Sequence, residues 1–251
     1  MKEIKDKFSN QSGYYKKYRP NYPEGLYQDV LKFVINRNEC LDCGTGNGQV
    51  AVELSKYFRK VCAIDISKKQ IDNAEKRENI IYSVERAENT NFNDSQFDLI
   101  TAGQAVHWFD LKEFNREVKR VSKNGGIISV WGYGLLRITE SINKLIDEFY
   151  YDIVGPYWNK ERKHIDNSYR SIKFDFEEIN LIQNWSMIFN WNIKELEGYL
   201  NTWSSVQNYK IENGGENPVY EIVEMIRDYW KDNSKKEVRF DIFMRMGRIE
   251  K

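Results

Sequence analysis

The residues best placed to do chemistry form a glycine-rich run, Leu41-Asp42-Cys43-Gly44-Thr45-Gly46-Asn47-Gly48. The run follows a short apolar segment and opens a stretch with helical periodicity. Glycines at such a junction let the backbone turn sharply and approach a ligand, because no Cβ stands in the way. Backbone N–H groups at the start of the helix favour a negative group. We therefore expect a ligand to bind at this junction.

A second part of the same site is Asp65, which ends the next apolar segment 21 positions after Gly44. A carboxylate at that distance is placed to accept hydrogen bonds from both hydroxyls of a ribose. The dinucleotide pattern G-x-G-x-x-G is not met, because position 49 is Gln. Together the two features indicate a ligand that contains adenosine, with a nicotinamide dinucleotide as the competing interpretation.

The elements that must position these residues alternate between apolar runs and amphipathic stretches. We predict strands at residues 40–43, 61–66, 80–84, 97–102 and 127–131, and helices at 49–58, 67–77 and 111–121. Ser67 with Gln70 fits a capping box, Asp110 with Glu113 fits a second cap, and Gly125-Gly126 is expected to end the third helix. Apolar strands that alternate with helices form a parallel sheet covered on both faces.

The second half of the chain is richer in aromatic residues and less regular. Six of the seven Trp and nine of the 16 Tyr lie after residue 130. We predict a helix at 135–153, an irregular stretch at 155–178, a strand at 185–191, a helix capped by Asn192 with Glu195, a helix that starts at Pro218, and a last strand at 237–248.

These patterns predict one α/β domain over residues 1–251, with a Rossmann-like, seven-stranded, mostly parallel sheet and helices on both faces. The last strand is expected to pair antiparallel at one edge, and an aromatic helical insertion after strand five is expected to form a lid. The domain divides into an N-terminal cover segment (1–35), a cofactor-binding core (36–132), a substrate lid region (133–184) and C-terminal strands and helices (185–251).

Composition narrows the range of partners. Lys+Arg and Asp+Glu are both 38, so the net charge is zero, whereas a sequence-independent nucleic-acid binder needs an excess of positive charge. No run approaches the ~18 apolar residues of a membrane span, and the N-terminus lacks the apolar core of a signal peptide. We therefore expect a cytoplasmic protein with a small-molecule substrate and no nucleic-acid or membrane partner. The sequence gives no indication of oligomeric state.

Cys40 and Cys43 spell C-x-x-C. Neither a second ligand pair for zinc nor a helix start for a redox motif accompanies them. In a strand, residues three apart point to opposite faces. We therefore predict buried thiols and no metal site.

The combination of D-x-G-x-G at Asp42–Gly46, Asp65 and Gly125-Gly126 resembles class I S-adenosylmethionine-dependent methyltransferases. More narrowly, the chain resembles the small-molecule subgroup that includes trans-aconitate methyltransferase-like proteins. The segments that carry this likeness are Tyr18-Arg19-Pro20-Asn21-Tyr22-Pro23, Arg86-Ala87-Glu88, Gln104-Ala105-Val106-His107-Trp108-Phe109 and Tyr199-Leu200-Asn201-Thr202-Trp203.

The resemblance implies S-adenosyl-L-methionine as the cofactor and assigns residues to its parts. The methionine part would be surrounded by Asp42, Gly44, Thr45 and Gly46. The ribose would bind Asp65, the adenine would pack on Ile66 and face Ala87 and Glu88, and Gln70 is a further expected contact. The sulfonium would lie over Gln104 and Ala105, and the segment that closes the site would bring Tyr14 and Arg19. Arg86 departs from the family pattern, because many members carry Asp there.

The chemistry of methyl transfer from a sulfonium mainly requires that the reactants be aligned and desolvated. A general base is needed only if the acceptor arrives protonated, and a carboxylate needs none. His107, which follows the fourth predicted strand, is the candidate base. The alternative is that His107 hydrogen-bonds backbone groups and shapes the loop.

The acceptor pocket is expected to be aromatic, and its candidate residues are Trp108, Trp131, Tyr133, Trp158, Tyr169 and Trp203. For Trp203, ordinary core packing is the favoured alternative. Arg170 is the candidate anchor for an acceptor carboxylate, against the simpler interpretation of a surface ion pair.

The sequence thus predicts methyl transfer from S-adenosylmethionine to a small-molecule acceptor, on a carboxylate or hydroxyl oxygen. The alternatives are a non-catalytic module that binds the cofactor or a partner, and a methyltransferase that acts on a macromolecule. The neutral charge and the lack of basic tracts disfavour a nucleic-acid acceptor.

Overall fold

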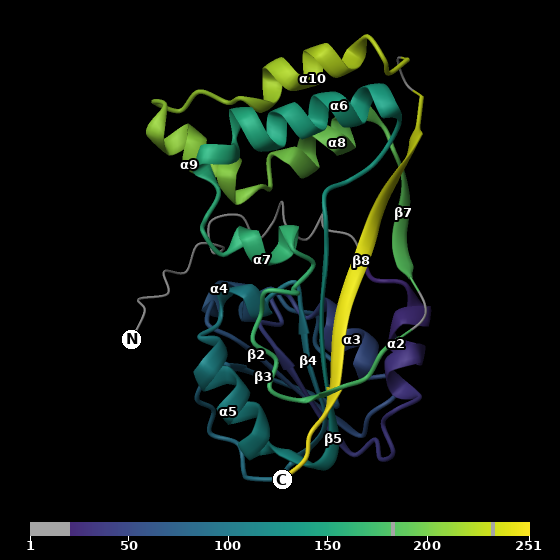
Figure 1. Cartoon of the computed structure of the whole chain (residues 1–251), viewed down its shortest axis with the longest axis vertical. Helices are drawn as coiled ribbons and strands as arrows, with labels where there is room; N and C mark the ends of the chain where they lie inside the picture. The colour runs from purple at the N-terminus through teal and green to yellow at the C-terminus, as the bar shows by residue number, and fades with distance from the viewer. Residues whose placement is uncertain (1–20, 182–183, 232–233) are drawn as a thin grey trace.

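The computed structural model describes residues 21–181, 184–231 and 234–251, so the expected contacts of Tyr14 and Arg19 lie outside the described residues. Its sheet has the strand order β3-β2-β1-β4-β5-β8-β6, and β7 pairs with β8 off this path (Figure 1). The strands are β1 (Glu39–Cys43), β2 (Lys60–Asp65), β3 (Ile80–Val84), β4 (Phe97–Gly103), β5 (Ser122–Tyr133), β6 (Glu177–Glu178), β7 (Trp185–Trp191) and β8 (Lys236–Arg248).

The first five strands run parallel, and β8 pairs antiparallel with β5, β6 and β7. This arrangement confirms the predicted Rossmann-like, mostly parallel sheet. The expected antiparallel pairing of the last strand is also present, and β6 and β7 lie on its other side.

Helices cover both faces of the sheet, as the uniformly apolar strands predict. Cys40 packs in one buried cluster with residues of α2 (Glu24–Leu31) and α3 (Gln49–Leu54), whereas Cys43 packs in a second cluster with residues of α5 (Leu111–Val121). The two thiols therefore point to opposite faces, and all three cysteines are buried and free. In the described ranges, no group of three or more His, Cys, Asp or Glu is arranged to hold a metal ion. No helix in those ranges has the length and apolar character that crossing a bilayer requires.

Two local predictions need correction. Ser67 caps the short helix α4 (Lys68–Asp72) by accepting from the backbone of Gln70, but the Ser67 N–H is donated to Asp65 instead of the Gln70 side chain. The predicted capping box is therefore only half formed.

Helix α5 begins at the Asp110 cap, as expected, but it ends at Val121 and not at a glycine. Gly125-Gly126 lies inside β5, where the pairing with β4 is irregular and Gly125 adopts φ +75°.

A helical cap sits above the carboxyl ends of the parallel strands (Figure 1). It contains α6 (Glu140–Glu148), a π-helical turn (Phe149–Ile153), a 3-10 turn (Gly155–Tyr157), α7 (Arg162–Asp166), α8 (Ile193–Leu200), α9 (Ser204–Glu212) and α10 (Val219–Arg227). The capping box of Asn192 and Glu195 is complete at the start of α8. The predicted helix at 135–153 starts late, because Arg137 is still extended and pairs with Arg239 of β8. The cap is thus built from two separate parts of the chain.

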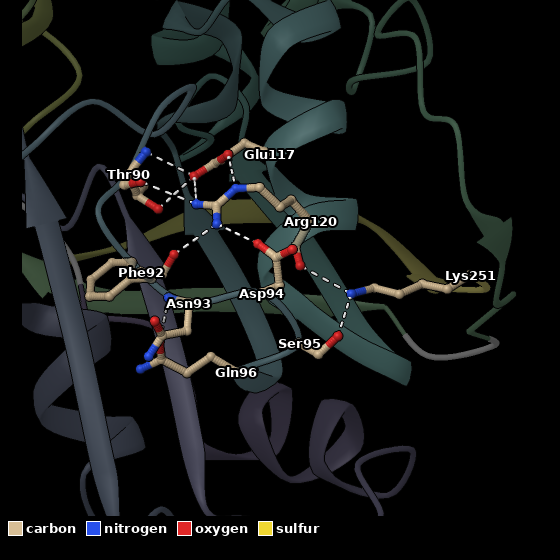
Figure 2. Close-up of polar contacts among 9 residues, drawn as sticks. All are labelled: Thr90, Phe92, Asn93, Asp94, Ser95, Gln96, Glu117, Arg120 and Lys251. Carbon is tan, nitrogen blue, oxygen red and sulfur yellow. Dashed lines mark hydrogen bonds and ion pairs between the residues drawn. The ribbon is translucent and has the colours of Figure 1, made fainter.

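A polar network fixes the loop between β3 and β4 against α5 (Figure 2). Arg120 on α5 donates five hydrogen bonds, to both Glu117 oxygens, to Asp94 Oδ1 and to the carbonyls of Thr90 and Phe92. The buried Glu117 also accepts from the N–H and the hydroxyl of Thr90, at 2.8 Å and 2.6 Å. Every N–H of the guanidinium is therefore used, so a lysine could not replace it.

We predict that Arg120→Ala lowers the free energy of unfolding by about 2–4 kcal/mol, because it leaves the buried Glu117 carboxylate without its cation. Burial acts to raise the pKa of Glu117, but the hydrogen bonds from Arg120 and Thr90 outweigh it and lower the pKa. The difference in free energy of unfolding between the wild type and Arg120→Ala should therefore be largest above the ordinary glutamate pKa of 4.5 and shrink below it. Urea unfolding at pH 7 and pH 3.5 measures both effects. The control is Arg116→Ala on the same helix, because Arg116 is exposed and its one ion pair among the described residues is with Glu113. Equal losses in the two variants would refute this role.

Candidate active site

A cavity of ≈ 270 Å³ lies between the sheet and the cap. Its floor comes from the glycine loop after β1 and from the residues that follow β2, β3 and β4, and its roof comes from α7 and the α8–α9 corner. This is the position at which parallel α/β sheets bind ligands, outside the carboxyl ends of the strands.

The cavity wall includes every cofactor residue expected from the sequence that lies in the described ranges. These are Asp42, Gly44, Thr45, Gly46, Asp65, Ile66, Gln70, Ala87, Glu88, Gln104 and Ala105. Residues from four separate loops are thus brought to one wall.

The glycine loop depends on the absence of side chains. Gly44 has φ +66°, and a Cβ there would lie 2.6 Å from the Cβ of Ala105. Gly48 has φ +87° and caps α3, and a Cβ there would collide with the ring of Tyr82. Any other residue at these two positions would destabilise the fold, both through the left-handed backbone and through the clash.

The sequence predicts that N–H groups of this loop favour a negative ligand group, but three of them bond within the protein. Thr45 donates to the Ile64 carbonyl at 2.9 Å, Gly46 donates to Asp65 Oδ2 at 2.9 Å, and Gly48 donates to the Thr45 carbonyl at 3.0 Å. These donors are therefore used inside the protein and are not offered to a negative group. The loop suits a ligand without phosphates, which disfavours a dinucleotide.

Asp65 is held rigidly at the cavity wall. Its Oδ2 accepts from Gly46 N, and its Oδ1 accepts from Ser67 N at 2.8 Å. A carboxylate oxygen can accept more than one hydrogen bond. Gln70, on the same wall, is buried, and its Oε1 has no hydrogen-bond partner among the described residues. A ligand that donates two or more hydroxyl protons fits this pair of acceptors.

Asp42 lies deeper, beneath the glycine loop. Its carboxylate accepts from the hydroxyls of Thr45 at 2.6 Å and Thr101 at 2.8 Å. Burial raises the pKa of Asp42 from 3.8 to about 7, although the two hydroxyls act to lower it. Near neutral pH this side chain therefore exchanges between a neutral and a charged form.

Glu88 is oriented by its surroundings at the adenine end that the resemblance implies. Its Oε1 accepts from Asp110 N at 3.0 Å and pairs with Arg86 at 3.4 Å. Arg86, which departs from the family pattern, thus compensates the charge of a buried carboxylate.

Gln104, directly after β4, has a strained backbone with φ +53°. Its N–H donates to the Trp131 carbonyl, and its Oε1 accepts from Tyr133 N at 2.9 Å. The Gln104 side chain therefore ties the end of β4 to β5. Strain of this kind persists where the surrounding structure fixes a functional geometry.

The candidate acceptor residues fall into two groups. Trp108, Tyr133, Trp158 and Trp203 line the cavity, as does His107. Trp131 does not, because its ring is buried in the core against Tyr22 and Tyr27. Tyr169 lies behind His107, and Arg170 is exposed at the surface.

Arg162 on α7 lines the cavity in the place that the sequence interpretation gave to Arg170. Its guanidinium lies over the Trp158 ring, 4.5 Å from the centroid. The i, i+4 spacing of Trp158 and Arg162 was the available sequence signal. Sequence reasoning also missed other lining residues, including Tyr22, Asn47, Phe109, Glu161, Ile165 and Tyr199.

We predict that the raised pKa of Asp42 makes the protein less stable as pH rises. A carboxyl group that holds its proton more tightly in the folded than in the unfolded state stabilises the fold at low pH. This stabilisation is lost as the proton dissociates, here between about pH 4 and pH 7. The loss should reach up to ~4 kcal/mol, and Asp42→Asn should abolish it. Urea unfolding from pH 4 to pH 8 measures the difference. The exposed Asp72→Asn is the control and should keep the wild-type profile. Parallel profiles for wild type and Asp42→Asn would show that Asp42 does not titrate in this range.

Comparison with known proteins agrees with this geometry. Residues 41–130 match a family model described as a methyltransferase domain. A Dictyostelium discoideum protein classed as a methyltransferase is 34% identical over 253 residues, which cover 98% of this chain and 95% of that protein. CRG1 of Saccharomyces cerevisiae, classed as an S-adenosylmethionine-dependent methyltransferase, is 24% identical over 62% of this chain and 58% of its own length.

A solved structure from Anaeromyxobacter dehalogenans, classed as a type II methyltransferase, superimposes with a TM-score of 0.85. It is 32% identical, and the alignment covers 93% of this chain and 99% of that one. The likeness therefore includes the cap as well as the sheet. The chain belongs to the class I S-adenosylmethionine-dependent methyltransferases.

Proposed function

We propose that this methyltransferase acts on a small molecule and transfers the methyl group to an oxygen, most simply that of a carboxylate. The observation that carries this proposal is the cap side of the cavity. Its wall is aromatic, with Trp158, Tyr199 and Trp203 beside a single guanidinium, that of Arg162, among the described lining residues. Such a wall disfavours water, and a guanidinium among its few polar groups can orient the acceptor.

Arg162 is held in place and still has donors to offer. Its Nε donates to the Tyr150 hydroxyl at 2.6 Å, and that hydroxyl donates to Asp166 at 2.6 Å. Within the described part of the chain, neither of its Nη groups makes a hydrogen bond, and the side chain is only 18% exposed. Two adjacent N–H donors on a fixed plane match the two oxygens of a carboxylate.

The floor residues would hold S-adenosylmethionine, which supplies an activated methyl group when bound. Asp65 and Gln70 would accept from the ribose hydroxyls, and the carboxylates of Asp42 and Asp65 suit a ligand with positive charge. Because a carboxylate acceptor arrives deprotonated, no residue of the chain has to remove a proton from it. The chain has to align the acceptor and keep water out.

We predict that Asp65→Ala weakens binding of S-adenosylmethionine and of S-adenosylhomocysteine by about 10–100-fold, the loss expected for hydrogen bonds to a charged group. Isothermal titration measures both ligands. Asp72→Ala, on the adjacent helix α4, is the control and should bind as wild type. Unchanged affinity in Asp65→Ala, or no binding to the wild type, would overturn the assignment of the floor.

We predict that Arg162→Ala raises the KM for a carboxylate acceptor by about tenfold or more while cofactor affinity stays unchanged. A panel of small carboxylic acids, each paired with its methyl ester, is assayed by release of S-adenosylhomocysteine. Arg170→Ala is the matched control, because that arginine is exposed outside the cavity. If the acids and their esters are methylated equally, or if both variants behave alike, Arg162 does not select a carboxylate.

A further inference from the structure

His107 and Tyr169 form a buried pair at the edge of the cavity. His107 lies in the 3-10 turn Val106–Trp108 that follows β4, lines the cavity and is 5% exposed. Its Nδ1 lies 2.9 Å from the hydroxyl of Tyr169. The imidazole also packs against the Trp108 ring, with centroids 4.9 Å apart. The histidine ring therefore has a defined orientation.

Tyr169 is placed by contacts from three directions. It has no exposed surface, and its ring meets Phe243 of β8 edge-on at 4.9 Å. Its N–H donates to the His164 carbonyl at 2.7 Å, and its own carbonyl accepts from Arg245 of β8 at 3.1 Å.

The backbone at this tyrosine is in the left-handed region, with φ +51° at Ser168 and +59° at Tyr169. A non-glycine residue adopts that conformation only at a cost. Two consecutive residues adopt this strained conformation, and it places the Tyr169 phenol behind the His107 imidazole.

The phenol determines which nitrogen of His107 carries the proton. In the described part of the chain, the only hydrogen bond of the Tyr169 hydroxyl is the one to His107 Nδ1. A buried O–H group must donate to an acceptor, and a neutral imidazole offers one such nitrogen. If Nδ1 carried the proton instead, the phenolic hydrogen would be buried without a partner. Burial also raises the pKa of Tyr169, so the phenol keeps its proton.

We propose that Tyr169 is a positioning residue that holds His107 in the Nε2–H tautomer, so that the imidazole donates a hydrogen bond to the acceptor oxygen. In this role His107 removes no proton, which differs both from the candidate base and from the loop-shaping residue that the sequence analysis offers as alternatives. The inference rests on the proposed function, because an oxygen that arrives as an anion needs no base and gains from a donor that orients it for attack.

The tautomer can be measured without any substrate. Two-bond ¹H–¹⁵N correlation spectra of the whole protein labelled at histidine distinguish Nε2–H from Nδ1–H, and the two histidines are assigned with His164→Gln. We expect Nε2–H at His107 in the wild type and loss of this single tautomer in Tyr169→Phe. Tyr220→Phe, at an exposed tyrosine, should leave the spectrum unchanged. An Nδ1–H tautomer in the wild type, or an unchanged spectrum in Tyr169→Phe, would overturn the proposal.

Turnover gives the second test, with an acceptor found in the panel above. His107→Gln keeps an N–H donor that can orient the acceptor and cannot act as a base, so it should retain activity within about tenfold, whereas His107→Ala should lose about 100-fold. We expect Tyr169→Phe to lower kcat by about tenfold with cofactor affinity unchanged. Equal loss in His107→Gln and His107→Ala would restore the role of base. If the wild type methylates no member of the panel, the proposed function fails while the spectra still decide the tautomer.

Discussion

Strand β8 holds the two walls of the cavity in register. It runs for 13 residues, and its two halves have different partners. Residues 242–248 pair with β5, and residues 236–242 pair with β7, which leads into the cap (Figure 1). Hydrogen bonds between strands fix distance and register along their whole length. The relative position of the glycine loop and the aromatic roof therefore depends on one continuous strand and not on a flexible hinge.

The same strand also places the residues behind His107. Arg245 of β8 donates to the carbonyls of Tyr169 and Ile172 and pairs with Glu178. Its guanidinium lies over the Phe174 ring, 4.6 Å from the centroid. Arg245 thus ties the irregular stretch between α7 and β6 to the sheet. This explains how a segment with little regular structure can keep a buried tyrosine in a strained conformation.

The floor of the site could be predicted from sequence more completely than the roof, where only Trp158 and Trp203 of the expected residues line the cavity. Gly44, Gly48 and Asp65 are dictated by local backbone geometry, because positive φ and the strand-to-helix turn leave few alternatives. The positions of Arg162 and Tyr169 depend on how the cap packs over the sheet, and the spacing of Trp158 and Arg162 alone does not show that they face the cavity. Arg170 follows an aromatic residue in the sequence, but the turn after α7 leaves it exposed. The local pattern of Gly125-Gly126 fits two structures, because glycine serves an irregular strand pairing as readily as a helix end.

The cavity carries charged groups of both signs. The carboxylates of Asp42, Asp65 and Glu88 lie on the floor, and Arg162 and Glu161 lie on the roof. In the proposed reaction, a positive donor and a negative acceptor both lose their charge as the methyl group passes between them. A strong ion pair to the acceptor would therefore stabilise the ground state more than the transition state. The ion pair from Arg162 to the acceptor is weakened, because Asp166 partly compensates the charge of the guanidinium. The Asp166 carboxylate lies 3.6 Å from Nε, and the Tyr150 hydroxyl bridges the two side chains. A cation compensated in this way can orient an acceptor without binding it too tightly to react.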